Sequence, residues 1–476
     1  MNRLIVASLM AVGVLALRAA DIDFPNLDQS GDLMSADAWG RDVPTVDAAR
    51  ITAGGTYVAS TNGMLGGLTI GSASKMVFDL TNGDEEDTTI TMAGPVKLSA
   101  TNRKVEFKGG TWDLQGLYGF SMGAWGDLNG NRVTFNGCVI TNVSSAYLYY
   151  GSATATGYWT LTNSANVFVK GRFEPAFNSV GTMDVVINSG STLSLGNGFT
   201  LGRQDSAKVG TVFHHAIHVS GCGSRFTSVA DSGSSTFSVG ESAGTGSVME
   251  VLDGAAASFS GGWGGILGNA ATSNSNVLRV AGCGSKMSIG TLYINKNGGF
   301  GNRLEAYDHG TATVYKVFLN GMDAQIVASN AVISCSDGIA WASGSDHVIR
   351  LSGNCPRISL ANGYSFKNRT QLVFDLDPNG YLDENVAPFY SAAWGSGDGT
   401  EEIIVTGIEE MQKRMVEQRI RRREMKLAFV PSAAWATTEA FARWNAHLPE
   451  GAELYWSLGY ICLRVNVKFG IMLIVR

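Results

Sequence analysis

The chain has 476 residues, of which 60 are glycine and only 9 are proline, and its charged fraction is 16%. Glycine is about twice as common as in an average globular protein, and charged residues are clearly rarer. The hydrophobic fraction of 45% excludes a wholly disordered chain. The net charge of -6 gives no basic footprint, so no nucleic-acid partner is expected.

The N-terminus has the pattern of a secretory signal. Arg3 is followed by an apolar run from Leu4 to Leu17 and then by small residues. This pattern predicts a signal peptide over residues 1–19 and an exported, extracellular or cell-surface protein. The alternative is a membrane anchor, although about 20 apolar residues are needed to cross a bilayer. We expect no transmembrane span after signal removal, and residues 20–50 are predicted to form an N-terminal cap segment.

Short alternating segments recur through the middle of the chain, and each is followed by a small-residue turn and a second short segment that ends in glycine or asparagine. Aligning the copies places eight apolar residues in one column: Val167, Leu193, Phe226, Phe259, Met287, Val314, Ile333 and Ile358. Period-2 alternation indicates strands, and a repeat of this length indicates a solenoid. We therefore predict an all-β chain, with a right-handed parallel β-helix over residues 51–400 whose coils stack on one another.

The wording of these repeats is similar to that of a known group of proteins. The stretches "VSGCGSRF", from Val219, and "FSVGESAGTGSVMEVLDGAAASFSGG", from Phe237, resemble the β-helical passenger regions of bacterial autotransporters and related surface proteins. The resemblance covers the repeat region. It implies an exported, extracellular β-helix. We expect a structural or adhesive role for the chain on a bacterial surface or in the secreted fraction, with cell-surface or extracellular glycans as the partners.

The cysteines follow the repeat. Cys222 and Cys283 occupy equivalent positions in the near copies "VSGCGSRF" and "VAGCGSKM". Two coils separate them, which corresponds to roughly 10 Å, beyond the reach of a disulfide. The sequence contains no Cys-x-x-Cys pair, so a zinc site has little support. We expect both to be small buried residues at a coil corner.

The stretch "FHHAIHV", from Phe213 to Val219, contains half of the six histidines. On a strand, His215 and Ile217 face one way while His214 and His218 face the other. His214 and His218 are then about 13 Å apart along the strand, too far to share a metal ion. No metal and no cofactor are predicted.

Acidic residues provide the test for an enzyme. One outward column reads His218, Glu250, Arg279 and Glu305, with Arg350 farther along. Glu250 and Glu305 are expected roughly 10 Å apart, near the upper end for an inverting glycosidase pair. Arg279 falls between them, which favours a solvated ladder of alternating charge.

The acidic run from Gly83 to Thr89 favours an exposed loop over a cation site, and no catalytic residue is assigned. A carbohydrate-active enzyme, either a polysaccharide lyase or a glycoside hydrolase, stays open as the alternative. It is favoured if acids and bases converge in one groove.

Aromatic residues provide a third alternative, a non-catalytic glycan-binding module. The candidate glycan contacts are Trp125, Tyr150, Trp159 and Trp263. Exposed aromatic faces supply a large contact area at little entropic cost. The competing interpretation is that these side chains plug the ends of the solenoid and cover its corners.

Residues 401–476 are predicted to form a small α+β cap. A capping box from Thr406 to Glu409 precedes apolar residues at helical spacing, namely Ile408, Met411, Met415 and Ile420. A second helix is expected in "SAAWATTEAFARWNAH". A hairpin that turns at Gly459 should follow it, and "FGIMLIVR" should form a terminal strand. The opposite face of the first helix would carry Arg414, Arg419, Arg421, Arg422 and Arg423. It could contact an anionic envelope surface, although interleaved acids favour a solvated face.

Overall fold

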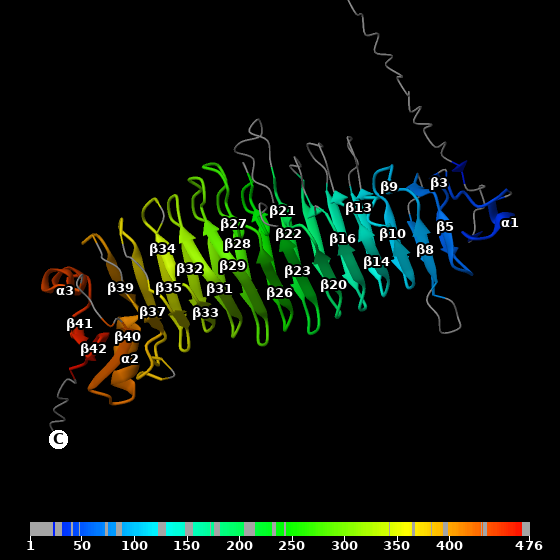
Figure 1. Cartoon of the computed structure of the whole chain (residues 1–476). Coiled ribbons are helices and arrows are strands. Elements are labelled where there is room, and N and C mark those ends of the chain that lie inside the picture. Colours follow the sequence, from blue (N-terminus) through cyan, green and yellow to red (C-terminus); the bar gives the residue numbers. More distant parts are fainter. Residues whose placement is uncertain are drawn as a thin grey trace, which may run out of the picture.

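The computed structural model describes residues 22–468 except 24–30, 40, 47, 72–74, 82–87, 122–129, 148–155, 172, 176–180, 204–214, 231–234, 242–243, 342, 364–366, 382, 394–397, 430 and 432–435. The fold is all-β, with 51% strand and 6% helix. Its strands form long parallel sheets in an arrangement compatible with a β-solenoid, and the molecule is an elongated rod (Figure 1).

Three parallel ladders run along the rod, and we call them ladders I, II and III. Ladder I is a 15-stranded sheet. Its strands, in stacking order, are β2 (Gly31–Asp32), β4 (Gly55–Val58), β7 (Lys75–Asp79), β10 (Lys104–Lys108), β13 (Asn131–Asn136), β16 (Gly157–Thr162), β19 (Met183–Ile187), β22 (His215–Ser220), β25 (Val248–Leu252), β28 (Val277–Ala281), β30 (Arg303–Tyr307), β32 (Gln325–Ser329), β35 (Val348–Gly353), β37 (Gln371–Leu376) and β39 (Glu402–Thr406).

Ladders II and III belong to one 27-stranded sheet, because the single strands β29 (Lys286–Ile294) and β31 (Thr311–Leu319) take part in both. The other strands of ladder II are β5 (Gly63–Leu65), β8 (Thr89–Met92), β11 (Thr111–Asp113), β14 (Val139–Val143), β17 (Asn166–Val169), β20 (Thr192–Leu195), β23 (Arg225–Ala230), β26 (Ala256–Gly261), β33 (Val332–Cys335), β36 (Arg357–Leu360), β38 (Phe389–Ser391) and β40 (Arg422–Phe429). Those of ladder III are β1 (Ile22–Asp23), β3 (Ala48–Ile51), β6 (Gly67–Ile70), β9 (Val96–Leu98), β12 (Phe120–Ser121), β15 (Ala146–Tyr147), β18 (Phe173–Glu174), β21 (Phe199–Leu201), β24 (Phe237–Val239), β27 (Gly265–Leu267) and β34 (Ile339–Trp341).

Alternating side chains build the core between the ladders. On β22, His215, Ile217 and Val219 are buried, while Ala216 and His218 face outward, as the pattern predicts. Equivalent inward residues stack along the rod, so that Phe78 and Phe107 are stacked register partners with ring centroids 5.3 Å apart. Core side chains in each coil therefore contact those of the next coil, and backbone groups pair between coils.

Glycine and asparagine share the corner between ladder III and ladder I. Gly240 and Gly268 end β24 and β27 with φ of 70° and 75°. A Cβ atom on either one would lie 2.1 Å from the amide nitrogen of Asn276 or Asn302, respectively. The buried asparagine side chains need this space, because they pair with backbone and with one another between coils. The corner therefore requires glycine for both its backbone angle and its missing side chain.

The structure corrects two positions of the predicted column. Leu193 pairs with Phe226, and Ile333 pairs with Ile358, as predicted. Phe226, however, pairs with Ala257 rather than with Phe259. Val314 likewise belongs with Cys335, two residues further along than Ile333. The alignment was wrong there because strands such as β26 and β31 are longer than their neighbours and carry two or more inward residues each.

The C-terminal elements lie at one end of the rod, and the four-residue helix α1 (Ala36–Trp39) lies toward the other end (Figure 1). They are α2 (Ile408–Glu417), α3 (Thr438–Asn445), β41 (Ala452–Ser457) and β42 (Tyr460–Asn466). β42 runs antiparallel to both β40 and β41, which confirms the hairpin around Gly459. β39 still pairs in parallel register with β37, so the stack extends to Thr406. The predicted terminal strand "FGIMLIVR" lies wholly outside the described residues.

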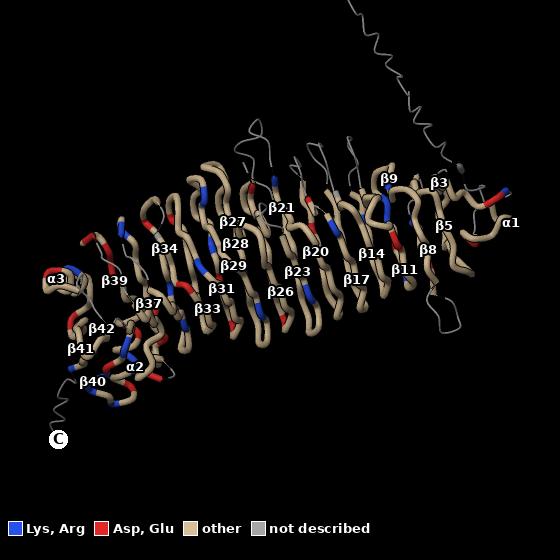
Figure 2. Tube along the Cα trace, in the orientation of Figure 1, with Lys and Arg blue, Asp and Glu red and all other residues tan. Residues whose placement is uncertain are grey.

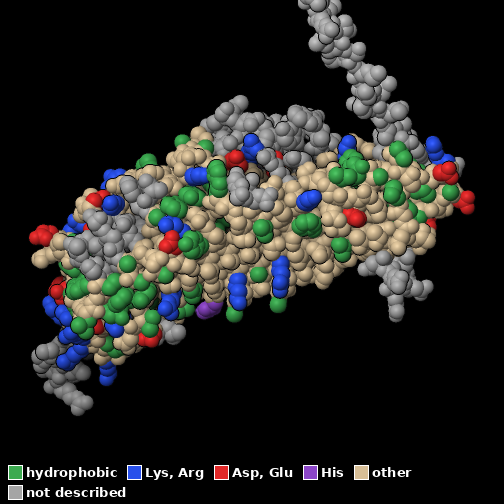
Figure 3. Space-filling model, in the orientation of Figure 1, with side chains coloured by type: hydrophobic (Ala, Val, Ile, Leu, Met, Phe, Trp, Pro, Cys, Tyr) green, Lys and Arg blue, Asp and Glu red, His purple; other side chains and the backbone are tan. Residues whose placement is uncertain are grey.

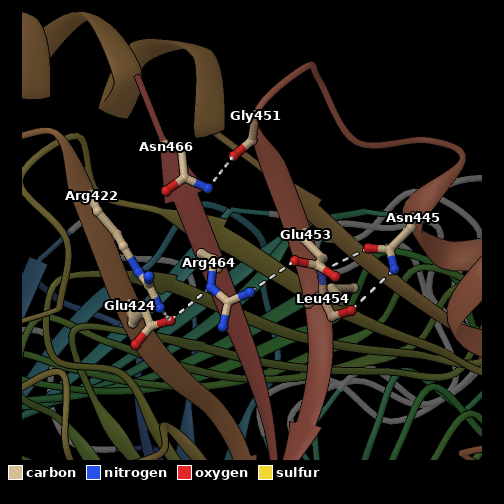
Figure 4. A network of polar contacts seen from close by, with 8 residues as sticks. All are labelled: Arg422, Glu424, Asn445, Gly451, Glu453, Leu454, Arg464 and Asn466. Carbon is tan, nitrogen blue, oxygen red and sulfur yellow. Dashed lines mark hydrogen bonds and ion pairs between the residues drawn. The ribbon is translucent and has the colours of Figure 1, made fainter. Parts of the chain in front are cut away.

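Polar contacts hold these elements together (Figure 4). Arg464 on β42 contacts Glu424 on β40 at 2.7 Å and Glu453 on β41 at 3.1 Å. Hydrogen bonds from Arg464 and Arg422 lower the pKa of Glu424 to about 2. The side-chain amide of Asn445, at the end of α3, donates to the backbone carbonyl of Leu454 and accepts from its backbone N–H. The antiparallel hairpin is therefore tied to both the parallel stack and the last helix.

Two expectations for this region were wrong. The N-cap of α2 is Gly407, and no side chain caps the helix, so the capping box does not form. The helix also ends at Glu417, and Arg422 and Arg423 lie on β40. Charged residues are frequent along the C-terminal elements (Figure 2). Most of the predicted basic face is paired with acids in Arg414–Glu417, Arg422–Glu424 and Arg423–Glu384.

Candidate functional site

Ladder I carries the column of charged residues that the repeat predicts. His218, Glu250, Arg279 and Glu305 are successive register partners, and Arg350 follows after Val327. Arg279 donates to Glu250 at 2.5 Å and to Glu305 at 2.8 Å. His218 Nδ1 lies 3.0 Å from Glu250 Oε2. Each acid therefore has a cation on at least one side.

The same contacts shift the pKa values of the column. The hydrogen bond between His218 and Glu250 raises the pKa of His218. The same hydrogen bond, together with the positive charge of the nearby Arg279, holds the pKa of Glu250 below its usual value. The Glu305 side chain is only 4% exposed, so the ladder is less solvated than expected. An acid that is to donate a proton needs a raised pKa. Because Glu250 is shifted the other way, the column supports a charge ladder and no acid–base pair.

Ladder III offers a different surface. Tyr293 on β29 and Phe318 on β31 are register partners that face outward, with ring centroids 4.7 Å apart and planes 7° apart. Trp263, in the turn before β27, is 63% exposed. The ammonium group of Lys296 lies 5.8 Å from the Trp263 ring and 5.2 Å from the Tyr293 ring. We call Trp263, Tyr293, Phe318 and Lys296 the aromatic platform.

A cavity of about 260 Å³ lies next to this platform on the same ladder. We call it the ladder III cavity, and the residues that line it and carry the argument are Glu174, Asn197, Arg203, Ser238, Glu241 and Ile266. Glu174 is 5% exposed, and Arg203 lies 3.8 Å from it. The buried Oδ1 of Asn197 and Oγ of Ser238 have no hydrogen-bond partner among the described residues. The cavity is therefore lined by acceptors whose bonds are open to a ligand.

The structure separates the four candidate glycan contacts. Trp263 is exposed on the platform, as glycan binding requires. Trp159 is 1% exposed, and its ring packs on Phe135 at 4.9 Å and on Phe120 at 5.4 Å. It faces the core because it occupies an inward position of β16, so its selection as a surface contact was wrong. Trp125 and Tyr150 lie outside the described residues.

The expectation for the cysteines was wrong. Cys222 and Cys283 are both exposed and free. Each lies at the tip of a turn between two glycines of positive φ, which projects it outward. The small buried residues of these corners are instead Ser224 and Ser285, whose hydroxyls accept backbone hydrogen bonds from Gly190 and Gly254.

Other predicted features are placed in part. His214 and residues 83–87 of the acidic run lie outside the described residues. Within the described part of the chain, no group of three or more His, Cys, Asp or Glu side chains could hold a metal ion. None of the described helices is long and apolar enough to cross a membrane.

Sequence reasoning missed Tyr293, Phe318 and the cavity residues, although a signal was present. Tyr293 and Phe318 are the second residues of the short segments "LYIN" and "VFLN", which close successive repeats. In a three-residue strand with inward first and third positions, the second residue faces outward. Glu174, Arg203 and Glu241 lie near corners of uneven length, where the repeat gives no alignment.

Comparison with known proteins adds no family. No family model, no curated protein and no solved structure matches the chain.

Proposed function

We propose that the chain is an exported, right-handed parallel β-helix with a C-terminal α+β cap, which serves as a structural and adhesive protein on a bacterial surface or in the secreted fraction. The secretory pattern of residues 1–19 supports export. The repeat wording, which resembles that of autotransporter passengers, supports a surface role. We further propose that adhesion occurs through carbohydrate bound at the aromatic platform.

The platform is the observation that carries this proposal. Trp263 is 63% exposed, so a ligand that covers its ring would remove apolar surface from water. Tyr293 and Phe318 present a flat, stacked pair of rings beside it. Sugar rings offer apolar C–H faces that pack on such rings, and rigid aromatic side chains lose little entropy in doing so. Lys296 lies against two of the rings and has no ion pair among the described residues, so its ammonium can donate hydrogen bonds to a bound sugar.

A glycan array on residues 20–476 tests this function. We expect retention of at least one glycan class, and loss of that retention in W263A. The matched control is W456A, because Trp456 is also partly exposed, at 37%, but lies on β41 at the capped end. The proposal fails if the array shows no retention, or if both tryptophan variants lose it equally.

A carbohydrate-active enzyme is the second candidate, and the ladder III cavity favours it. Two carboxylates, Glu174 and Glu241, and the guanidinium of Arg203 line this one cavity. Paired carboxylates are the usual machinery of glycosidases. Incubation with polysaccharides, with and without calcium, would reveal new reducing or unsaturated ends if the chain is an enzyme. E241Q should then abolish product release while retention at the platform persists.

A further inference from the structure

The aromatic platform and the ladder III cavity are parts of one surface. A single outward column of register partners connects them: Thr200, Ser238, Ile266, Tyr293 and Phe318. The first three residues line the cavity, and the last two belong to the platform. Because Ile266 and Tyr293 are direct partners on β27 and β29, no coil separates the two parts.

The length of this surface constrains the ligand. It extends over six consecutive strands, from β18, which carries Glu174, to β31, which carries Phe318. Five steps between strands at about 4.8 Å each correspond to about 24 Å along the rod. One sugar unit of an extended polysaccharide has nearly the length of one such step. A polysaccharide chain parallel to the rod axis would therefore stay in phase with the strands.

The chemistry of the cavity suits hydroxyl groups. The unpaired oxygens of Asn197 and Ser238 are acceptors, and Ser238 is only 3% exposed. Glu241 adds a carboxylate that has no ion pair among the described residues. A buried acceptor without a donor costs free energy, and a sugar hydroxyl can supply that donor. At about 260 Å³ the cavity is smaller than typical drug-sized sites, so it has room for about one sugar unit.

The charges along this surface balance. Arg203 pairs with Glu174 at 3.8 Å, and Lys316, beside Phe318, pairs with Asp337 at 2.8 Å. The other charged residues named here are Glu241 in the cavity and Lys296 on the platform, which are opposite in sign. Among the described residues of this surface, three cations face three carboxylates, so their charges do not favour a charged polymer.

We infer that the ligand of this surface is a neutral, extended polysaccharide that lies along the rod axis, with a sugar ring on the platform and a hydroxyl-bearing unit in the cavity. This inference rests on the proposed function and specifies the class of its ligand. Contacts at both ends of the surface are available only to a chain long enough to reach from Phe318 on the platform to Glu174 in the cavity. Affinity must therefore increase with chain length.

Isothermal titration calorimetry on residues 20–476 tests the inference. The probes are cello-oligosaccharides and N-acetylated chito-oligosaccharides of two, four and six units, with a six-unit oligogalacturonide as the anionic comparison. We expect one neutral series to bind, with Kd falling about tenfold or more from two to six units because hydrogen bonds in the cavity are added. E241A should weaken the six-unit probe by about tenfold and leave the two-unit probe unchanged. W263A should weaken both, and E409A, which removes an exposed carboxylate from α2, should weaken neither.

Three outcomes distinguish this inference from the function on which it rests. Equal affinity for two and six units, with both lost in W263A, would overturn the extended ligand while the platform function stands. A preference for the oligogalacturonide would overturn the neutral ligand. Failure of every neutral and anionic probe, together with an empty glycan array, would overturn the function and the inference together.

Discussion

The rings of Phe226 and Phe259 lie 5.5 Å apart at an angle of 80° in consecutive coils, although the two residues are not register partners. Phe226 is paired with the small Ala257, which leaves space that the ring of Phe259 fills from two residues away. Both rings are almost completely buried. The core of the rod therefore packs diagonally between coils as well as along columns.

Truncation of Phe226 to alanine should lower the free energy of unfolding by about 3–5 kcal/mol, because it leaves a cavity in a close-packed core. F226D should be more damaging, since it buries an unpaired charge. Val229 on the same strand β23 is 54% exposed, and V229A should change stability by less than about 0.5 kcal/mol. Urea denaturation followed by circular dichroism measures both. Equal stability of F226A and the parent chain would contradict the packing described above.

Replacing Arg279 with methionine should destabilise the chain by about 3 kcal/mol, because it leaves Glu250 and the buried Glu305 without the cation that they share. R279M/E305Q should recover part of this loss. Arg350 lies in the same column, but its pair with Asp375 is exposed on both sides, at 45% and 28%. R350M should therefore cost less than about 1 kcal/mol. If R279M and R350M had the same midpoint in urea titration, the position of Arg279 between two carboxylates would add nothing to the free energy of unfolding.

His347 should make stability fall with acid. Burial lowers the pKa of His347 to about 4, whereas an unfolded histidine titrates near 6.5. Between these values the unfolded chain binds a proton that the folded chain does not. The stabilisation is therefore complete above pH 6.5 and is lost as the pH falls to 4, by roughly 3 kcal/mol in total.

H347N provides the matched test of this titration. His347 Nδ1 accepts a hydrogen bond from the backbone N–H of Ala324. At the same kind of corner, the side-chain oxygen of Asn302 accepts a hydrogen bond from the backbone N–H of Asn276. Asparagine should keep that bond and remove the titration. We expect the difference in unfolding free energy between parent and variant to change with pH between 4 and 6.5. A constant difference would show that His347 does not titrate in this range.

Loss of Asn302 should open the corner between ladder III and ladder I. Its Oδ1 accepts from both the backbone and the side chain of Asn276 at 2.8 Å, and its Nδ2 donates to the carbonyl of Ser273. N302A leaves these buried groups unpaired and should cost about 3 kcal/mol. N297A is the control, because the contacts of Asn297 are exposed. Hydrogen exchange should show faster exchange at Asn276 in N302A alone.

The sequence predicts the stacking of the coils better than it predicts the surface they present. His218, Glu250, Arg279 and Glu305 fall into one column because alternation on a strand has a period of two, and each of these strands has the same phase. Phe259 is misplaced because a strand with two inward residues permits two alignments that differ by one period. Strand pattern alone cannot choose between them.

The site is harder to predict for a related reason. Trp159 and Trp263 are both candidate glycan contacts by residue type, yet one ring lies inside and the other outside, because Trp159 occupies an inward strand position and Trp263 a turn. Glu174, Arg203 and Glu241 come together from three coils of unequal length. Their convergence depends on how the extra residues leave the corners, which no repeat specifies.

The reversal of strand direction at β42 has a consequence for assembly. A parallel stack can accept a further coil from the same or another molecule, since its last strand still offers unpaired backbone groups. In ladder II the strand after β40 runs antiparallel, and in ladder I the chain ahead of β39 is held by Trp444 and Arg443 of α3. These contacts oppose the stacking of a further parallel coil on ladders I and II at this end, and with it end-to-end growth into fibres.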